Sequence, residues 1–503
     1  MVKTAIKAGL WVLVWTLARA DEYFVDCSAS AEGNGSRERP WNSLEQVNER
    51  VFGAGDCILF RAGCRWGGVL RPQGSGSEQA PIRITSFAAR REVKREEDDE
   101  GKEEEDEKDE ENGEGPIIDG EGATAAMVLT NQDHWIISHL TVTNAGEKLA
   151  MRQGIYVAAN DGKTHRGIRI EANQVHHVAG QTDKAKHAAD FSRSACISVN
   201  ATPPSRYDDV LVKANCVSNC GGGGIKVRTG GMQNRGQAVQ VTQNRIDACG
   251  GDGIVTSYST SPLLDYNVAS NLGKGAYPWT GGNFAGIWVL GNRDPVMAHN
   301  VVYGTVMSVF DSMAFDCDWG NEGVCVVEYN FSRDNAGGAF LNCDGCGTPG
   351  GADQVVRYNV FQNDCRIYSN GDLPELSFYN NVVYCPDKPF DLVLPPRTRF
   401  TNNIFIGNAS SKLPSRHGIE WLDNVFDRVP PPTDNGIRGD AGLVDAGSGG
   451  SDLDSVAGYM LRASSVALAN GRVVADNGGR DFFGNPVSSS DRPNRGVYNG
   501  PGV

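Results

Sequence analysis

The middle of the chain repeats a four-residue phrase in which a small residue precedes an apolar, a variable and usually a second apolar residue. Successive side chains of a β-strand point to opposite faces, so the second and fourth positions are predicted to point inward and the third outward. The copies occupy residues 154–157, 196–199, 224–227, 253–256, 286–289, 314–317 and 339–342. Each repeat is therefore predicted to contain a short strand with one buried face.

An asparagine beside apolar or aromatic residues recurs between these phrases. Its copies are Asn215, Asn244, Asn267, Asn300, Asn330, Asn359, Asn381, Asn403 and Asn424. They lie 29, 23, 33, 30, 29, 22, 22 and 21 residues apart, a spread too irregular for a helical solenoid. A β-solenoid keeps its strands and varies its loops. The chain is therefore predicted to be all-β, with coils of 21–33 residues, about three short strands in each coil, and parallel sheets stacked along one axis.

The repeated asparagine has a physical role in such a coil. A side-chain amide at a turn can bond the backbone and its own copy in the next coil, about 4.8 Å away. Cys220 and Cys249 each follow one of these asparagines by five residues. We therefore expect these two cysteines to stack on adjacent coils, close enough for a disulfide.

These repeats make the chain resemble the right-handed parallel β-helix proteins of the pectin-lyase-like superfamily, from about Tyr23 to the carboxyl end. The segments that carry the resemblance outside the repeats are 23–26, 40–41, 55–60, 82–84, 117–120 and the closing motif 480–486. The resemblance implies one β-helix domain over residues 21–503, with a closing segment from about 430 to 503. It also implies a secreted, carbohydrate-active protein whose cleft lies on one of the sheets. No motif fixes a single enzyme family.

Net charge and the length of the apolar runs exclude two classes of partner, nucleic acid and the membrane interior. The net charge of -15 argues against nucleic acid, which needs a basic surface. No apolar run approaches the ~18–20 residues of a membrane span. Residues 90–114 hold 15 acidic and 6 basic side chains and almost no apolar ones, so they are predicted to form a disordered surface insertion.

The amino terminus has the pattern of an export signal. Lys3 and Lys7 precede an apolar run that ends at the A-x-A motif 18–20. Residues 1–20 are therefore predicted to be removed and the protein to be secreted. We expect the secreted protein to be a monomer. Export makes disulfides expected among the 13 cysteines, with at least one thiol left over. Acceptor motifs for N-glycosylation occur at Asn34, Asn200, Asn330 and Asn408, of which Asn330 is expected to be buried as a repeat asparagine.

The outward positions of the repeated strand predict a sugar-binding groove. The third positions align, coil by coil, as Tyr156, Ser198, Lys226, Val255, Trp288, Asp316 and Leu341. The outward positions two residues later are Ala158, Asn200, Arg228, Ser257, Leu290, Asp318 and Cys343. One sheet would therefore display two cations, an aromatic platform and two carboxylates, with Tyr156 at one end.

Asp316 and Asp318 are the candidate catalytic pair. Positions i and i+2 of a strand face the same way with Cα atoms ~6.5–7 Å apart. Paired carboxyl groups can divide acid and base work, because proximity raises one pKa, and glycosidases act in this way. Asp311 and Asp334 lie in flanking turns and could add a third carboxylate. The alternatives are that the pair caps turns or binds a structural cation such as calcium; no cofactor is certain.

Lys226 and Arg228 allow a second chemistry. Polysaccharide lyases of similar fold use a basic residue beside a uronate carboxylate, often with calcium. The pair lies three coils from Asp316, roughly 14 Å, so it is expected to bind an acidic sugar at a distal subsite, or else to be an exposed solubilising pair. Asp252 is a weaker candidate, since a residue at a strand entry is more often part of a turn.

The pattern as a whole favours a secreted glycoside hydrolase that acts on a polysaccharide through paired carboxylates. A lyase acting on a uronate polymer is the alternative enzyme. A non-catalytic carbohydrate-binding or adhesin-like β-helix is the alternative of a different class.

Deleting residues 90–114 is expected to leave Tm and activity nearly unchanged, because the segment has almost nothing to bury and loop length costs little. Differential scanning calorimetry of the full chain and the deletion variant measures this. A large fall in Tm would contradict a solvated insertion.

Overall fold

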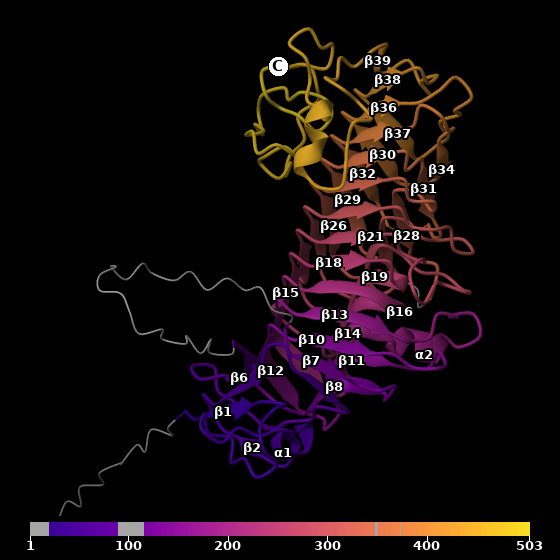
Figure 1. The fold of residues 1–503 in the computed structure, drawn as a ribbon. Coiled ribbons are helices and arrows are strands. Elements are labelled where there is room, and N and C mark those ends of the chain that lie inside the picture. The colour runs from indigo at the N-terminus through magenta and orange to yellow at the C-terminus, as the bar shows by residue number, and fades with distance from the viewer. Residues whose placement is uncertain (1–19, 89–114, 348–350, 373) are drawn as a thin grey trace, which may run out of the picture.

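The structure is a computed structural model that describes residues 20–88, 115–347, 351–372 and 374–503. The strands wind into coils, each with up to three strands, and the strand ladders between coils are parallel, as in β12 (Thr164–Glu171) pairing with β15 (Arg206–Lys213). The coils stack along one axis from the indigo end to the orange end of Figure 1. The chain is a parallel β-helix, which confirms the predicted fold class.

The coils present three faces. The first face is a 14-stranded sheet. Its strands are β1 (Glu22–Val25), β3 (Cys57–Arg61), β6 (Ile82–Phe87), β9 (Trp135–Ser138), β12, β15, β17 (Val239–Thr242), β20 (Leu263–Asp265), β23 (Val296–Ala298), β26 (Val324–Glu328), β29 (Asp353–Arg357), β32 (Leu376–Tyr379), β35 (Thr398–Thr401) and β37 (Ile419–Leu422).

The second and third faces form one continuous 23-stranded sheet, because β16 (Cys216–Arg228) runs through the corner between them. The second face contains β4 (Arg65–Gly67), β7 (Ile117–Asp119), β10 (Thr141–Asn144), β13 (Gln174–Val178), β16, β18 (Arg245–Asp247), β21 (Val268–Ser270), β24 (Val301–Tyr303), β27 (Phe331–Arg333), β30 (Val360–Gln362), β33 (Val382–Tyr384), β36 (Ile404–Ile406), β38 (Val425–Asp427) and β39 (Ile437–Arg438). The third face contains β8 (Ala125–Thr130), β11 (Gln153–Ala159), β14 (Ala195–Ala201), β16, β19 (Gly250–Ser257), β22 (Ile287–Leu290), β25 (Phe315–Asp318), β28 (Phe340–Cys343), β31 (Arg366–Ser369) and β34 (Asp391–Val393).

Helices are few and short. They are α1 (Leu44–Asn48), α2 (Ala188–Arg193) and a 3-10 turn at Asp454–Tyr459, and the small strands β2 (Val51–Phe52) and β5 (Gln73–Gly74) pair near the amino end. No helix in the described ranges is long and apolar enough to cross a membrane. The predicted signal segment, apart from Ala20, and the predicted insertion 90–114 lie outside the described residues.

The asparagine ladder is present as predicted. The Nδ2 of Asn215 donates to Oδ1 of Asn244 at 3.0 Å, and the backbone N–H of Asn215 donates to the same oxygen at 3.0 Å. This two-bond contact repeats at each step to Asn424, and one further asparagine, Asn173, extends it at the other end. The residue before each repeat asparagine has a positive φ, for example 53° at Tyr266, which turns the chain at the same point in every coil. Asn330 is fully buried, as expected of a ladder residue.

The predicted strand register is also confirmed, and the predicted Cys220–Cys249 disulfide is wrong. Ile225 and Ile287, predicted to point inward, are fully buried. Cys220 instead bonds Cys196 of the preceding coil, and Cys249 stays a buried free thiol. Cys196 and Cys249 are both candidate partners of Cys220, and the stacking of coils alone does not decide between them. Four further disulfides link Cys27–Cys64, Cys317–Cys325, Cys343–Cys346 and Cys365–Cys385.

The carboxyl-terminal segment lies along the second face. Outward apolar residues of successive coils, among them Val301, Phe331 and Val360, pack with Tyr459 and Val497 in a second hydrophobic cluster. Figure 1 shows this yellow segment beside the orange coils. It therefore adds a layer to one side of the coils.

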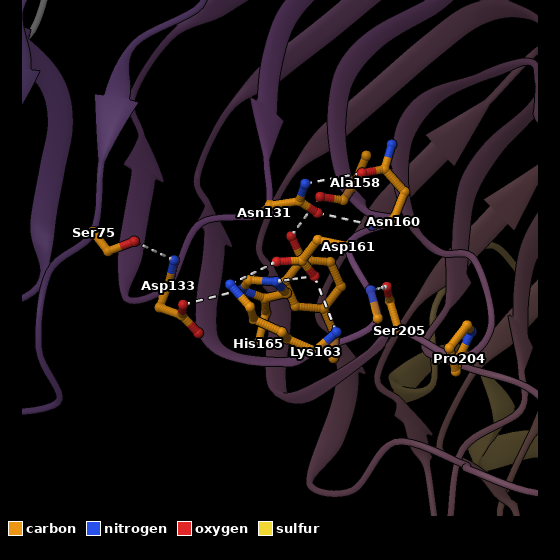
Figure 2. A network of polar contacts seen from close by, with 12 residues as sticks. Ser75, Asn131, Asp133, Ala158, Asn160, Asp161, Lys163, His165, Pro204 and Ser205 are labelled. Carbon is orange, nitrogen blue, oxygen red and sulfur yellow. Dashed lines mark hydrogen bonds and ion pairs between the residues drawn. The ribbon is translucent and has the colours of Figure 1, made fainter.

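A buried histidine ties two turns near the amino end (Figure 2). His165 lies between two carboxylates, with Nδ1 3.0 Å from Asp133 and Nε2 3.0 Å from Asp161. The hydrogen bond from His165 is the main reason that the pKa of Asp161 falls to about 2, and the backbone N–H of Lys163 adds to it. The imidazole thus links the turn before β9 to the turn before β12.

Replacing Asn300 by Ala is expected to lower the free energy of unfolding by about 2–4 kcal/mol, since it leaves several buried backbone and amide groups without partners. Urea unfolding measures the change. The exposed Asn160→Ala is the control and should change stability by about 0.5 kcal/mol or less. Equal effects at the two sites would show that the ladder does not stabilise the coils.

The Asp161 carboxylate should make stability depend on acid. Its folded pKa is below its ordinary value of 3.8, so its contribution is present above about pH 4 and is lost as the pH falls toward 2. Wild type should therefore have a higher Tm than Asp161→Asn at pH 6, and the difference should shrink between pH 4 and 2. A difference that stays constant over this range would contradict the assignment.

Candidate active site

The third face brings the predicted outward residues together in the predicted order. Lys226 pairs with Val255, Val255 with Trp288, and Trp288 with Asp316, each on the next strand. The outward positions two residues further along each strand form a second row. In this row Asn200 pairs with Arg228, and Asp318 holds the same position on β25. Residues far apart in the sequence, such as Asn200 and Asp318, thus share one surface.

Loops cover part of this surface, which the strand pattern does not reveal. Residues 180–187, with α2 behind them, meet the loop 275–284 through a bridge between Asp183 and Gly281 and a 3.0 Å contact between the hydroxyls of Thr182 and Thr280. Asp316 is only 2% exposed and Lys226 only 7%. These side chains point away from the coil, as predicted, but into a covered space.

Lys226 forms a buried ion pair. Its Nζ lies 3.1 Å from Oδ2 of Asp252 and donates to the carbonyl of Phe191 at 2.8 Å, so it is not an exposed solubilising residue. Burial lowers its pKa, while the charge of Asp252 opposes that shift. The other oxygen of Asp252 accepts a 3.1 Å hydrogen bond from Nε1 of Trp288. Lys226 and Asp252 therefore fix the orientation of the indole, a larger role for Asp252 than the turn residue it was expected to be.

Three carboxyl groups have strongly altered acidity. Burial raises the pKa of Asp318 to about 7 and that of Asp311 to about 6, and it raises that of Asp316 well above the ordinary range. The charges of Asp318 and Asp311 raise the pKa of Asp316 further. The positive charge of Lys184 has the opposite effect and lowers the pKa of all three carboxyl groups. Asp318 and Asp311 are half-buried, and Oδ1 of Asp316 has no hydrogen-bond partner among the described residues. The site therefore holds carboxyl groups that titrate near neutral pH.

Two predicted site residues lie apart from this cluster. The carboxylate of Asp334 is exposed and bound by Arg333 at 2.7 Å and by Nδ2 of Asn363 at 2.8 Å, at the end of β27 on the second face. Tyr156 lies on the third face but two strands beyond Lys226, where its hydroxyl accepts a 3.5 Å hydrogen bond from Asn200. Asp334 is not part of the site that the structure assembles.

A cavity of about 250 Å³ lies beside Trp288. Its walls include the predicted residues Arg228, Trp288 and Asp252, together with Lys184, Phe191, Arg193 and Tyr258, which the sequence pattern missed. Lys184 comes from a covering loop, Phe191 and Arg193 come from α2, and Tyr258 directly follows β19. The available signal was the pair of cationic and aromatic residues in 184–193, a segment outside the repeated phrase.

The described residues offer no oxygen-rich metal cage in this region. Within them, the groups of three potential ligands with atoms inside 4.8 Å of one another are Asp26–Cys27–Cys64 and Asp318–Cys343–Cys346. Both contain a disulfide, and calcium prefers six to eight oxygen ligands. Neither group fits calcium.

Comparison with known proteins agrees with this fold. The model of the right handed beta helix region matches residues 125–306. The chain has the right-handed parallel β-helix fold. It is 24% identical, over 96% of its length, to a lacto-N-biosidase of Bifidobacterium longum subsp. longum, of which it spans 36%. The crystal structure of the GH136 lacto-N-biosidase from Eubacterium ramulus superimposes with a TM-score of 0.57 at 16% identity, covering 83% of this chain and 68% of that one.

Proposed function

We propose that the protein is a secreted glycoside hydrolase that cleaves a polysaccharide at Asp318 and Asp311. The observation that carries the proposal is the pair of half-buried carboxyl groups with pKa values of about 7 and 6, next to an indole held in place by Lys226 and Asp252. Similarity to a lacto-N-biosidase supports hydrolysis of a glycosidic bond, although this chain spans only about a third of that protein.

The two carboxyl groups suit different halves of the reaction. Both pKa values lie close to neutral pH, so one carboxyl group can be protonated while the other is ionised. We assign Asp318, which has the higher pKa, as the general acid that protonates the leaving oxygen, and Asp311 as the base or nucleophile on the anomeric side. Asp316 is too buried to touch a sugar, and the charges of Asp318 and Asp311 raise its pKa, which favours its neutral form.

Trp288 supplies the surface on which a sugar ring can stack. Its indole is half-exposed, and its N–H bond to Asp252 keeps the ring from rotating. The pairing of Trp288 with Asp316 places the platform one strand spacing, about 4.8 Å, from the carboxyl cluster. A sugar on Trp288 therefore lies beside the bond to be cleaved.

Incubation with a panel of polysaccharides tests the reaction. New reducing ends without the ultraviolet absorbance of an unsaturated uronate are expected. That absorbance would instead indicate the lyase, and binding without products would indicate a non-catalytic module.

Asp318→Asn and Asp311→Asn should each lower kcat by ~10²–10⁴-fold, because an amide cannot transfer the proton or act as the base. Neither should destabilise the protein. The folded pKa of Asp318 lies above its ordinary value of 3.8, so its stabilising contribution is present below that pH and lost as the pH rises through about 7. At pH 8 the Asn variant should therefore have a higher Tm than wild type, and at pH 4 an equal one.

Two matched substitutions control this experiment. Asp334→Asn makes the same change outside the cluster and should leave kcat unchanged. Asp316→Asn replaces a buried carboxyl group that is held in its neutral form by a neutral amide, so it should lower kcat less than either of the other two Asn variants. Near-normal kcat in both Asp318→Asn and Asp311→Asn would place the catalytic centre elsewhere.

A further inference from the structure

The cavity beside Trp288 is lined by more cations than carboxylates. Lys184, Arg193, Lys226 and Arg228 all contribute to its wall, and Asp252 is the only carboxylate there. Lys226 and Asp252 neutralise each other at 3.1 Å. Three positive charges therefore remain on the cavity wall, in a chain whose net charge is -15.

Arg228 and Lys184 are available to a ligand. Neither forms an ion pair with any carboxylate in the described ranges, and both lie over aromatic rings instead. The guanidinium of Arg228 is 4.9 Å from the ring of Tyr258, and Nζ of Lys184 is 5.6–5.7 Å from those of Phe191 and Trp288. Nε of Arg228 donates to the carbonyl of Gly230 at 3.4 Å, so the terminal nitrogens of the guanidinium are the donors that a ligand could use.

Arg193 is a weaker third cation. It forms a 3.3 Å ion pair with Asp190, but both side chains are about half exposed, so water and salt screen the pair. Arg193 can turn from Asp190 to an anion in the cavity at little cost.

Three aromatic rings and cations without a carboxylate partner on one wall match a charged sugar. A guanidinium binds a planar carboxylate or a sulfate through two parallel hydrogen bonds, and indole and phenol rings stack on the apolar face of a sugar. We propose that this cavity is a subsite for a sugar unit that carries an anionic group, either a carboxylate or a sulfate ester, with Arg228 and Lys184 as its ligands.

This proposal rests on the proposed hydrolase and specifies its substrate. Arg228 occupies the same outward row as Asp318 but three strands away, about 14 Å. The charged unit is therefore a neighbour along the polymer and not the unit that is cleaved. The substrate class that follows is an acidic or sulfated polysaccharide cut at a bond some way from the charge.

Binding to the full chain with Asp318→Asn tests the subsite without turnover. The probes are a galacturonate pentamer and its methyl ester for the carboxylate, and a sulfated carrageenan oligosaccharide and a neutral agarose oligosaccharide for the sulfate. Isothermal titration calorimetry should show at least tenfold tighter binding of one charged probe than of its neutral counterpart. The difference should decrease as NaCl rises.

Arg228→Gln and Lys184→Gln, each added to Asp318→Asn, should weaken binding of the charged probe about tenfold and leave the neutral probe unchanged. Arg166→Gln removes an exposed cation from β12 on the first face and should change neither. Circular dichroism confirms that the variants remain folded.

The outcomes separate the two proposals. Equal binding of charged and neutral probes, or charged binding that survives both Gln variants, overturns the anionic subsite. Charge-dependent binding that both Gln variants weaken supports the subsite, even if Asp318→Asn proves to retain turnover and the catalytic assignment fails.

Discussion

The asparagine ladder is the interaction on which the rest of the structure depends. Each ladder amide donates to the asparagine of the next coil and receives from that of the previous one, in a fully buried position. Because the register of every coil is pinned at this point, loops of different length can leave and return without shifting the strands. Trp288 and Asp316 become neighbours for this reason, although 27 residues separate them.

The covering loops convert an aligned surface into a chemical site. An open strand face would leave Asp316 and Asp318 in water with ordinary acidity. In the folded protein these side chains are shielded from water, and burial is the largest cause of the raised pKa values. The segment 180–187 brings Lys184, whose charge limits the shift. Keeping carboxyl groups in such a place destabilises the fold at alkaline pH, a cost typical of functional sites.

The repeated strands of this structure could be predicted from the sequence, and the contacts made by the loops could not. Period-two alternation and stacking are properties of single coils, so the inward Ile225 and Ile287 and the order from Tyr156 to Leu341 could be predicted. The environment of Lys226 could not, because Asp252 and the carbonyl of Phe191 reach it from other coils and from a loop with no repeat. The partner of Cys220 was missed for a related reason, since Cys196 does not occupy the stacked position of the preceding coil, which is Val178.

The layer that residues beyond about 430 add to the second face has a consequence for synthesis on the ribosome. A β-helix can in principle form coil by coil as the chain emerges, since each coil contacts only its neighbours. The outward apolar residues from Val301 to Val425 break that order, because Tyr459 and Val497 that cover them are made last. The later coils therefore keep an uncovered apolar side until the segment from about 430 to 503 has been made, and chaperones that hold nascent chains have a defined stretch to protect.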